Sequence, residues 1–72
     1  MNGEPFLRKR SLSLSGHRTS VALEPEFWAV LDALAARNKQ TLASLVAEAD
    51  ASREPGRPLS SALRLLALRA PG

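Results

Sequence analysis

The fold of this chain is decided by one short stretch, which reads Arg18-Thr-Ser-Val-Ala-Leu23-Glu24-Pro25-Glu26. Its first six residues alternate, with threonine, valine and leucine at the odd positions, and this is the period of a half-buried strand. The proline falls where a helix would begin, and a missing N–H costs nothing there because the first turn has no partner for it. The stretch therefore predicts a strand that leads directly into a helix.

The residues before this stretch repeat the alternation in the opposite phase. Residues 11–15 read Ser-Leu-Ser-Leu-Ser, which places Leu12 and Leu14 on one face, and Gly16 follows. A single flat strand cannot change phase without turning its apolar side chains toward both faces. Gly16 is therefore expected to mark a bulge or a turn. The pattern leaves open whether residues 11–15 form a second strand.

Three apolar stripes follow the strand at helical spacing. They predict helices over about 25–37, 41–51 and 59–69, and a loop rich in proline and glycine precedes the third. Thr41 is a good N-cap for the second helix. Leucines of the third helix are expected both to pack on the first two helices and, on its other side, to offer Leu65 and Leu68 to a partner.

Length and composition exclude several classes of protein. The chain has 72 residues, no cysteine and one histidine, so neither a disulfide nor a metal site is expected. No catalytic set of side chains and no glycine-rich phosphate loop are recognisable, so we expect neither an enzyme nor a cofactor. No apolar run approaches the roughly 20 residues that span a bilayer. The expectation is a protein of the cytoplasm that does not enter a membrane.

A second copy of the chain is the expected source of stability. A domain this small buries only about 60% of its unfolded surface, and a lone strand or hairpin is not stable in water. Pairing the strand with its copy across a two-fold axis gives an antiparallel ribbon. The expected dimer core is Val21, Leu23, Trp28, Leu31, Leu34, Leu45 and Val46.

Positive charge is concentrated at one end of the chain. Residues 1–18 contain four basic side chains and one acidic one, whereas residues 19–72 contain six of each. Residues 1–10 are interpreted as a flexible basic arm before a domain over 11–70. A localised basic segment suits a polyanion such as DNA, although a solvated tail that improves solubility explains the same charge.

Taken together, these elements resemble the ribbon-helix-helix family, which includes the Arc and MetJ repressors. The resemblance covers about residues 18–50, and the segments 16–24 and 59–65 look like a bacterial variant subfamily with an extra C-terminal helix. It implies a mainly helical fold with a short N-terminal β-ribbon, in an intertwined homodimer. The family usually has glycine between its two helices. Asn38 stands in that turn and tolerates a left-handed backbone.

The resemblance also implies a site. Outward residues of the ribbon would enter the major groove of double-stranded DNA, and the start of the second helix would hold a phosphate. Ala22 replaces a polar base-contacting side chain, so recognition there would depend on DNA shape or on a thymine methyl group. The candidate DNA-binding residues are Arg18, Ser20, Ala22, Thr41, Lys39, Arg8, Lys9, Arg10 and His17. For His17, a structural role is the alternative.

A sequence-specific regulator, and in particular a repressor, is the function that these features favour. The alternatives are a protein-interaction module of the kind found in antitoxins and an oligomeric scaffold, in which the third helix joins dimers into a higher oligomer. Only the first predicts DNA binding that falls steeply with salt.

Overall fold

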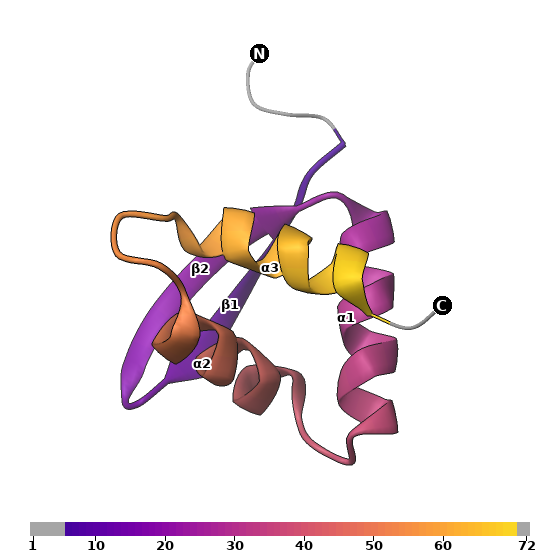
Figure 1. Ribbon diagram of the computed structural model, residues 1–72, viewed down its shortest axis with the longest axis horizontal. Coiled ribbons are helices and arrows are strands. Elements are labelled where there is room, and N and C mark those ends of the chain that lie inside the picture. The colour runs from indigo at the N-terminus through magenta and orange to yellow at the C-terminus, as the bar shows by residue number, and fades with distance from the viewer. Residues whose placement is uncertain (1–5, 71–72) are drawn as a thin grey trace.

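The computed structural model describes residues 6–70. It contains two strands and three helices in chain order: β1 (Arg8–Leu14), β2 (His17–Leu23), α1 (Pro25–Arg37), α2 (Leu42–Ser52) and α3 (Leu59–Arg69). Figure 1 shows α3 crossing in front of the β1–β2 hairpin, with α1 beside it. The expected fold class, a mainly helical domain with an N-terminal ribbon and a third helix, is confirmed.

A tight turn joins the two strands of the hairpin. Ser15 and Gly16 both have positive φ, 51° and 82°, which is the pattern of the type I′ turn that suits the twist of paired strands. The antiparallel register runs from Leu14 opposite His17 to Arg8 opposite Leu23. Gly16 therefore marks a turn, and residues 11–14 do belong to a second strand. The change of phase across Gly16 keeps the apolar residues of both strands on one face.

The first strand begins earlier than expected, and this corrects the boundary of the basic arm. Residues 8–10 are paired opposite residues 21–23, so they are part of the sheet. Contacts of Arg10 hold this part of the strand against α1. Its guanidinium lies 4.7 Å from the centre of the Trp28 ring and forms two hydrogen bonds with the Asp32 carboxylate, at 3.0 and 3.1 Å. Residues 6 and 7 of the expected arm precede the strand, and its first part, residues 1–5, lies outside the described residues.

The start of α1 is held by backbone hydrogen bonds to Glu24. Its carbonyl accepts the N–H groups of Phe27 and Trp28, at 3.0 and 3.2 Å. Pro25 occupies the first turn, as predicted. The Glu24 side chain also accepts a hydrogen bond of 3.0 Å from Arg64 of α3. One residue thus begins α1 and ties α3 to it.

The pair of Glu24 and Arg64 predicts a loss of stability in acid. A hydrogen bond from its own backbone N–H and one from Arg64 hold the pKa of the Glu24 carboxyl below its ordinary value of 4.5. A lowered folded-state pKa contributes stability that is present above the unfolded value and is lost as pH falls through the folded one. We expect the melting temperature of Glu24→Gln to fall less than that of the wild type as pH is lowered from 5 toward 3. Glu26→Gln serves as the control, and parallel melting curves for wild type and Glu24→Gln would contradict the expectation.

The turn between α1 and α2 differs in one respect from the sequence-based interpretation. Lys39 adopts the left-handed conformation, with φ of 56°, whereas Asn38 stays near −86°. The N–H of Lys39 bonds to the carbonyl of Ala36 and that of Gln40 to the carbonyl of Ala35, as in a Schellman motif, which places its left-handed residue just after the C-cap. Asn38 is itself the C-cap, so the left-handed position falls to lysine.

Lys39→Gly should therefore stabilise the protein. The left-handed conformation costs a non-glycine residue about 1–2 kcal/mol, and the extra chain entropy of glycine offsets about 0.5–1 kcal/mol of the gain. We expect the free energy of unfolding to rise by about 0.5–1 kcal/mol in a urea titration. Asn38→Gly is the matched control and should destabilise, because Asn38 has negative φ. A destabilised Lys39→Gly would show that the side chain contributes more than the backbone strain costs.

The core closes within one chain. Six of the seven expected core residues are at most 5% exposed, and Leu34 is partly buried against them. The third helix supplies Leu63, which is fully buried, and Ala67. As predicted, α3 contacts both α1 and α2, and it also contacts β2. Leu68 points outward and is 72% exposed, whereas Leu65 is only partly exposed.

Candidate nucleic-acid interface

The outer face of the hairpin is the candidate interface. Alternate residues of the two strands form it: Lys9, Ser11, Ser13, Arg18, Ser20 and Ala22. All are exposed except Ala22, which is partly buried. The opposite, inner face contains the buried Leu14, Val21 and Leu23. The alternation predicted for residues 18–23 is thus what the structure shows.

Hydrogen bonds across the two strands order this outer face. Ser11 and Ser20 face each other with their hydroxyl oxygens 3.3 Å apart. Beside them, an Nη atom of Arg18 donates to the Ser13 hydroxyl at 3.4 Å. These contacts lie within a ladder of paired backbones, which leaves the side chains standing away from the sheet. The Arg18 guanidinium is therefore held beside the ribbon with most of its donors available.

The outer face is positive. It contains Lys9 and Arg18, and residues 5–23 of the sequence include no acidic side chain. Hydroxyl groups fill most of the remaining positions. Such a surface can donate hydrogen bonds to an anion and offers no carboxylate to repel it.

Two of the expected basic contacts turn toward the other face of the sheet. Arg8 and Arg10 share the register positions of Leu23 and Val21. Arg10 is committed to Asp32 and to the Trp28 ring, so it is not placed to bind DNA. The Arg8 carbonyl accepts a 2.7 Å hydrogen bond from the Trp28 indole, although the Arg8 side chain is exposed. Of the three basic residues assigned to the arm, only Lys9 lies on the outer face.

The remaining candidates lie at two turns. His17 is exposed beside the hairpin turn, opposite Leu14. Thr41 is the N-cap of α2, as predicted, and its hydroxyl accepts the N–H of Ser44 at 3.0 Å. Lys39 precedes it in the same exposed turn. Figure 1 shows this α1–α2 turn apart from the hairpin tip, so one chain brings together the outer-face residues but not the helix start.

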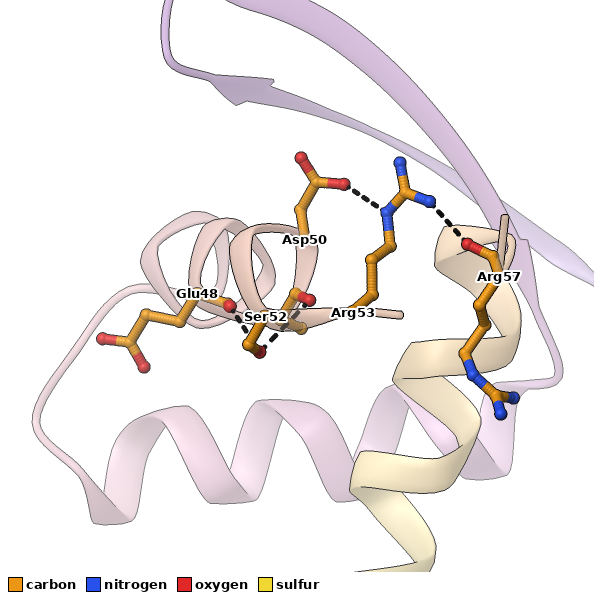
Figure 2. Close-up of polar contacts among 6 residues, drawn as sticks. Glu48, Asp50, Ser52, Arg53 and Arg57 are labelled. Carbon is orange, nitrogen blue, oxygen red and sulfur yellow. Dashed lines mark hydrogen bonds and ion pairs between the residues drawn. The ribbon is translucent and has the colours of Figure 1, made fainter. Parts of the chain in front are cut away.

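A second concave surface, between α2 and α3, has a different character. The hollow has a volume of about 410 Å³, and its lining includes Leu45 and Leu66 beside charged side chains. Arg53 is one of its lining residues, and Figure 2 shows this side chain hydrogen-bonded to Asp50 and to the backbone carbonyl of Arg57. The Arg57 guanidinium is engaged by Glu54 and Ser61. Each of these two arginines is therefore paired with a carboxylate, whereas the outer face contains no acidic side chain.

The sequence interpretation missed Ser11 and Ser13 as members of the outer face. The signal was present, because both alternate with Leu12 and Leu14. It became useful only once the hairpin register placed Ser11 opposite Ser20 and Ser13 opposite Arg18.

A comparison with protein families finds that residues 7–70 match the model of the ribbon-helix-helix domain. The chain belongs to the ribbon-helix-helix family. Among solved structures, it is similar to an uncharacterized protein from Bordetella pertussis Tohama I, with a TM-score of 0.70 and 33% identity over 88% of this chain. The chain spans about half of that protein, 54% of its length. A search of curated proteins finds no match.

Ribbon-helix-helix proteins are in general DNA-binding regulators and are typically not enzymes. Within residues 6–70, no helix is long and apolar enough to cross a membrane. No cluster of three metal-ligating side chains occurs in the part of the chain that the structure describes.

Proposed function

We propose that this ribbon-helix-helix protein is a sequence-specific transcriptional regulator, a repressor of the bacterial cytoplasm that binds double-stranded DNA as a homodimer. The observation that carries the proposal is the outer face of the hairpin. It is exposed, positive and rich in hydrogen-bond donors, and it belongs to a domain whose family binds DNA.

In this proposal β2 reads the major groove. Arg18 can donate two hydrogen bonds to one guanine, which is the commonest specific contact with DNA. Ser20 can donate to or accept from a base edge, whereas Ala22 offers only a methyl group, which suits a thymine methyl or a readout of DNA shape. The 3.4 Å hydrogen bond to Ser13 occupies one Nη donor of Arg18 and leaves the others for a base.

The start of α2 is the second part of the proposed site. Its first N–H groups have no helical partners, and a phosphate there is favoured by the helix dipole. Lys39, in the turn before it, adds a positive charge. Lys39→Gly should weaken binding to every DNA sequence by a similar factor although it stabilises the fold, so unfolding cannot explain that loss.

The homodimer would form along the free edge of β2. Within the described sheet, β2 pairs on one side only, with β1. An unpaired strand edge is a ready template for another strand, and a two-fold axis perpendicular to the sheet would leave both outer faces on the same side. Within one chain, β1 already pairs with β2, and α3 already covers the core. The dimer would therefore add an interface between two folded chains and would not be needed to complete either core.

Dimerisation predicts a melting temperature that depends on protein concentration. Unfolding of a dimer releases two chains, so mass action stabilises it as concentration rises. We expect the melting temperature to increase over a hundredfold range of concentration, and sedimentation to give the mass of two chains. A concentration-independent melt and the mass of a single chain would contradict the proposed dimer.

Selection from random duplex DNA, followed by binding at several salt concentrations, tests the proposed function. The expected result is an enriched motif with two-fold symmetry and an affinity that falls with salt by about 0.9 in logarithmic slope for each phosphate contact. No enriched motif, together with no salt-dependent binding, would contradict it.

A protein-interaction role is the second candidate. The observation that favours it is Leu68 on α3, which is 72% exposed although it is a large apolar side chain. In that role the outward side of α3 would bind a partner protein or join dimers into a higher oligomer. Leu68→Lys would then abolish the larger assembly and leave DNA binding intact.

A further inference from the structure

The outward row of β1 belongs to the outer face of the hairpin but takes no part in the proposed reading of bases by β2. Lys9, Ser11 and Ser13 form it, and each lies directly beside a residue of β2, namely Ala22, Ser20 and Arg18. All three side chains of β1 are exposed and face the same way as the reading residues. A ligand that lies across the outer face would therefore contact both strands.

The chemistry of this row suits phosphate oxygens rather than base edges. Lysine is a compact positive charge that binds phosphate without the planar fork that reads guanine. A serine hydroxyl has one donor and two acceptor positions. Ser13 accepts from Arg18 at 3.4 Å, so its own O–H is still able to donate. Either hydroxyl of the Ser11–Ser20 pair can be the donor between them, so Ser11 can donate outward when Ser20 donates to it. Every member of the row can thus donate a hydrogen bond, and none repels an anion.

The geometry of a dimer places the row at the margins of the groove. Neighbouring strands lie about 4.8 Å apart, so in a sheet with two β2 strands at its centre each β1 lies about 7 Å from the axis. The major groove is about 12 Å wide, which leaves about 6 Å on each side of the axis. The two β1 strands would then lie over the phosphate backbones that border the groove.

We propose that Lys9, Ser11 and Ser13 bind DNA phosphates on both sides of the groove that β2 reads. This inference rests on the proposed function and on the dimer through β2. It gives the two strands of the hairpin different tasks: β2 selects the sequence, and β1 supplies affinity that does not depend on sequence. The contacts lie within the folded sheet, unlike those of a flexible arm.

Lys9→Ala and Ser11→Val test this division, measured by binding to a selected site and to scrambled DNA over a range of salt. We expect Lys9→Ala to weaken binding to both DNAs by the same factor and to reduce the salt slope by about 1.8, since each dimer loses two phosphate contacts of about 0.9 each. Ser11→Val should weaken binding to both by roughly tenfold or more, because a hydrogen bond to a charged group is lost from each chain. Ser11→Thr keeps the hydroxyl and should restore binding.

Two controls accompany these variants, one for charge and one for folding. Arg69→Ala removes an exposed cation from the end of α3, far along the chain from the hairpin, and should leave the salt slope unchanged. Circular dichroism melting confirms that each variant is folded. If Lys9→Ala keeps the wild-type slope, or if Ser11→Val leaves the affinity for both DNAs unchanged, then β1 does not act on phosphates and the proposal is overturned. If the wild-type protein binds no DNA, the proposed function is itself overturned, and the proposed role of β1 is overturned with it.

Discussion

Trp28→Ala should lower the free energy of unfolding by about 3–5 kcal/mol, the usual cost of removing a buried aromatic side chain. A domain of this size has a total stability of about 4–11 kcal/mol. The substitution is therefore expected to remove a large share of the stability or to unfold the protein.

The expected loss is large because Trp28 joins the first strand to the first helix. The ring is 2% exposed. Its indole N–H donates to the Arg8 carbonyl at 2.7 Å, and the Arg10 guanidinium lies 4.7 Å from its centre. Alanine at this position removes the packing of the ring, the hydrogen bond and the stacked cation together.

A second variant separates these contributions. Trp28→Phe keeps an aromatic ring but leaves the Arg8 carbonyl without its donor, which should cost about 1–3 kcal/mol beyond the change in packing. Urea titrations followed by circular dichroism measure both variants, since the only tryptophan of the chain is lost. A cost below about 1 kcal/mol for Trp28→Ala would contradict its position at the centre of the core.

Arg18→Ala should abolish sequence preference in DNA binding. Each lost base contact costs about 1–3 kcal/mol. The proposed dimer contains two copies, so affinity for the selected site should fall by roughly 30-fold or more, at 1.4 kcal/mol for each factor of ten. Scrambled DNA, to which the guanidinium makes no base contact, should lose much less. Binding to both DNAs, measured at constant salt, gives the ratio that defines specificity.

Arg18→Lys is the matched control for charge. It keeps the positive charge but loses the planar fork of donors. We expect it to retain the wild-type salt slope and to lose preference for the selected site, as Arg18→Ala does. If Arg18→Ala binds the selected site as tightly as the wild type, β2 does not read the DNA, and the interaction role of α3 becomes the better account.

Local pattern predicted much of this protein correctly. The bounds of α1 and α3 agree with the structure, and α2 differs by one residue at each end. The alternation of residues 18–23 predicted which side chains face outward, and Thr41 was predicted as an N-cap. These features succeed because each depends on residues within a turn or two of one another, where periodicity and capping chemistry decide the backbone.

Contacts between residues far apart in the chain decided the rest. The start of the first strand could not be predicted, because a charged residue, Arg10, at an inward position breaks the apolar alternation. Asp32 and the Trp28 ring, 22 and 18 residues away, stabilise the guanidinium there. The left-handed backbone of Lys39 follows from where α1 must end to let α2 turn back. The core closes in one chain because α3 covers it with Leu63 and Ala67. No local pattern contains these facts, since each is set by the free energy of packing or ion pairing between separate elements.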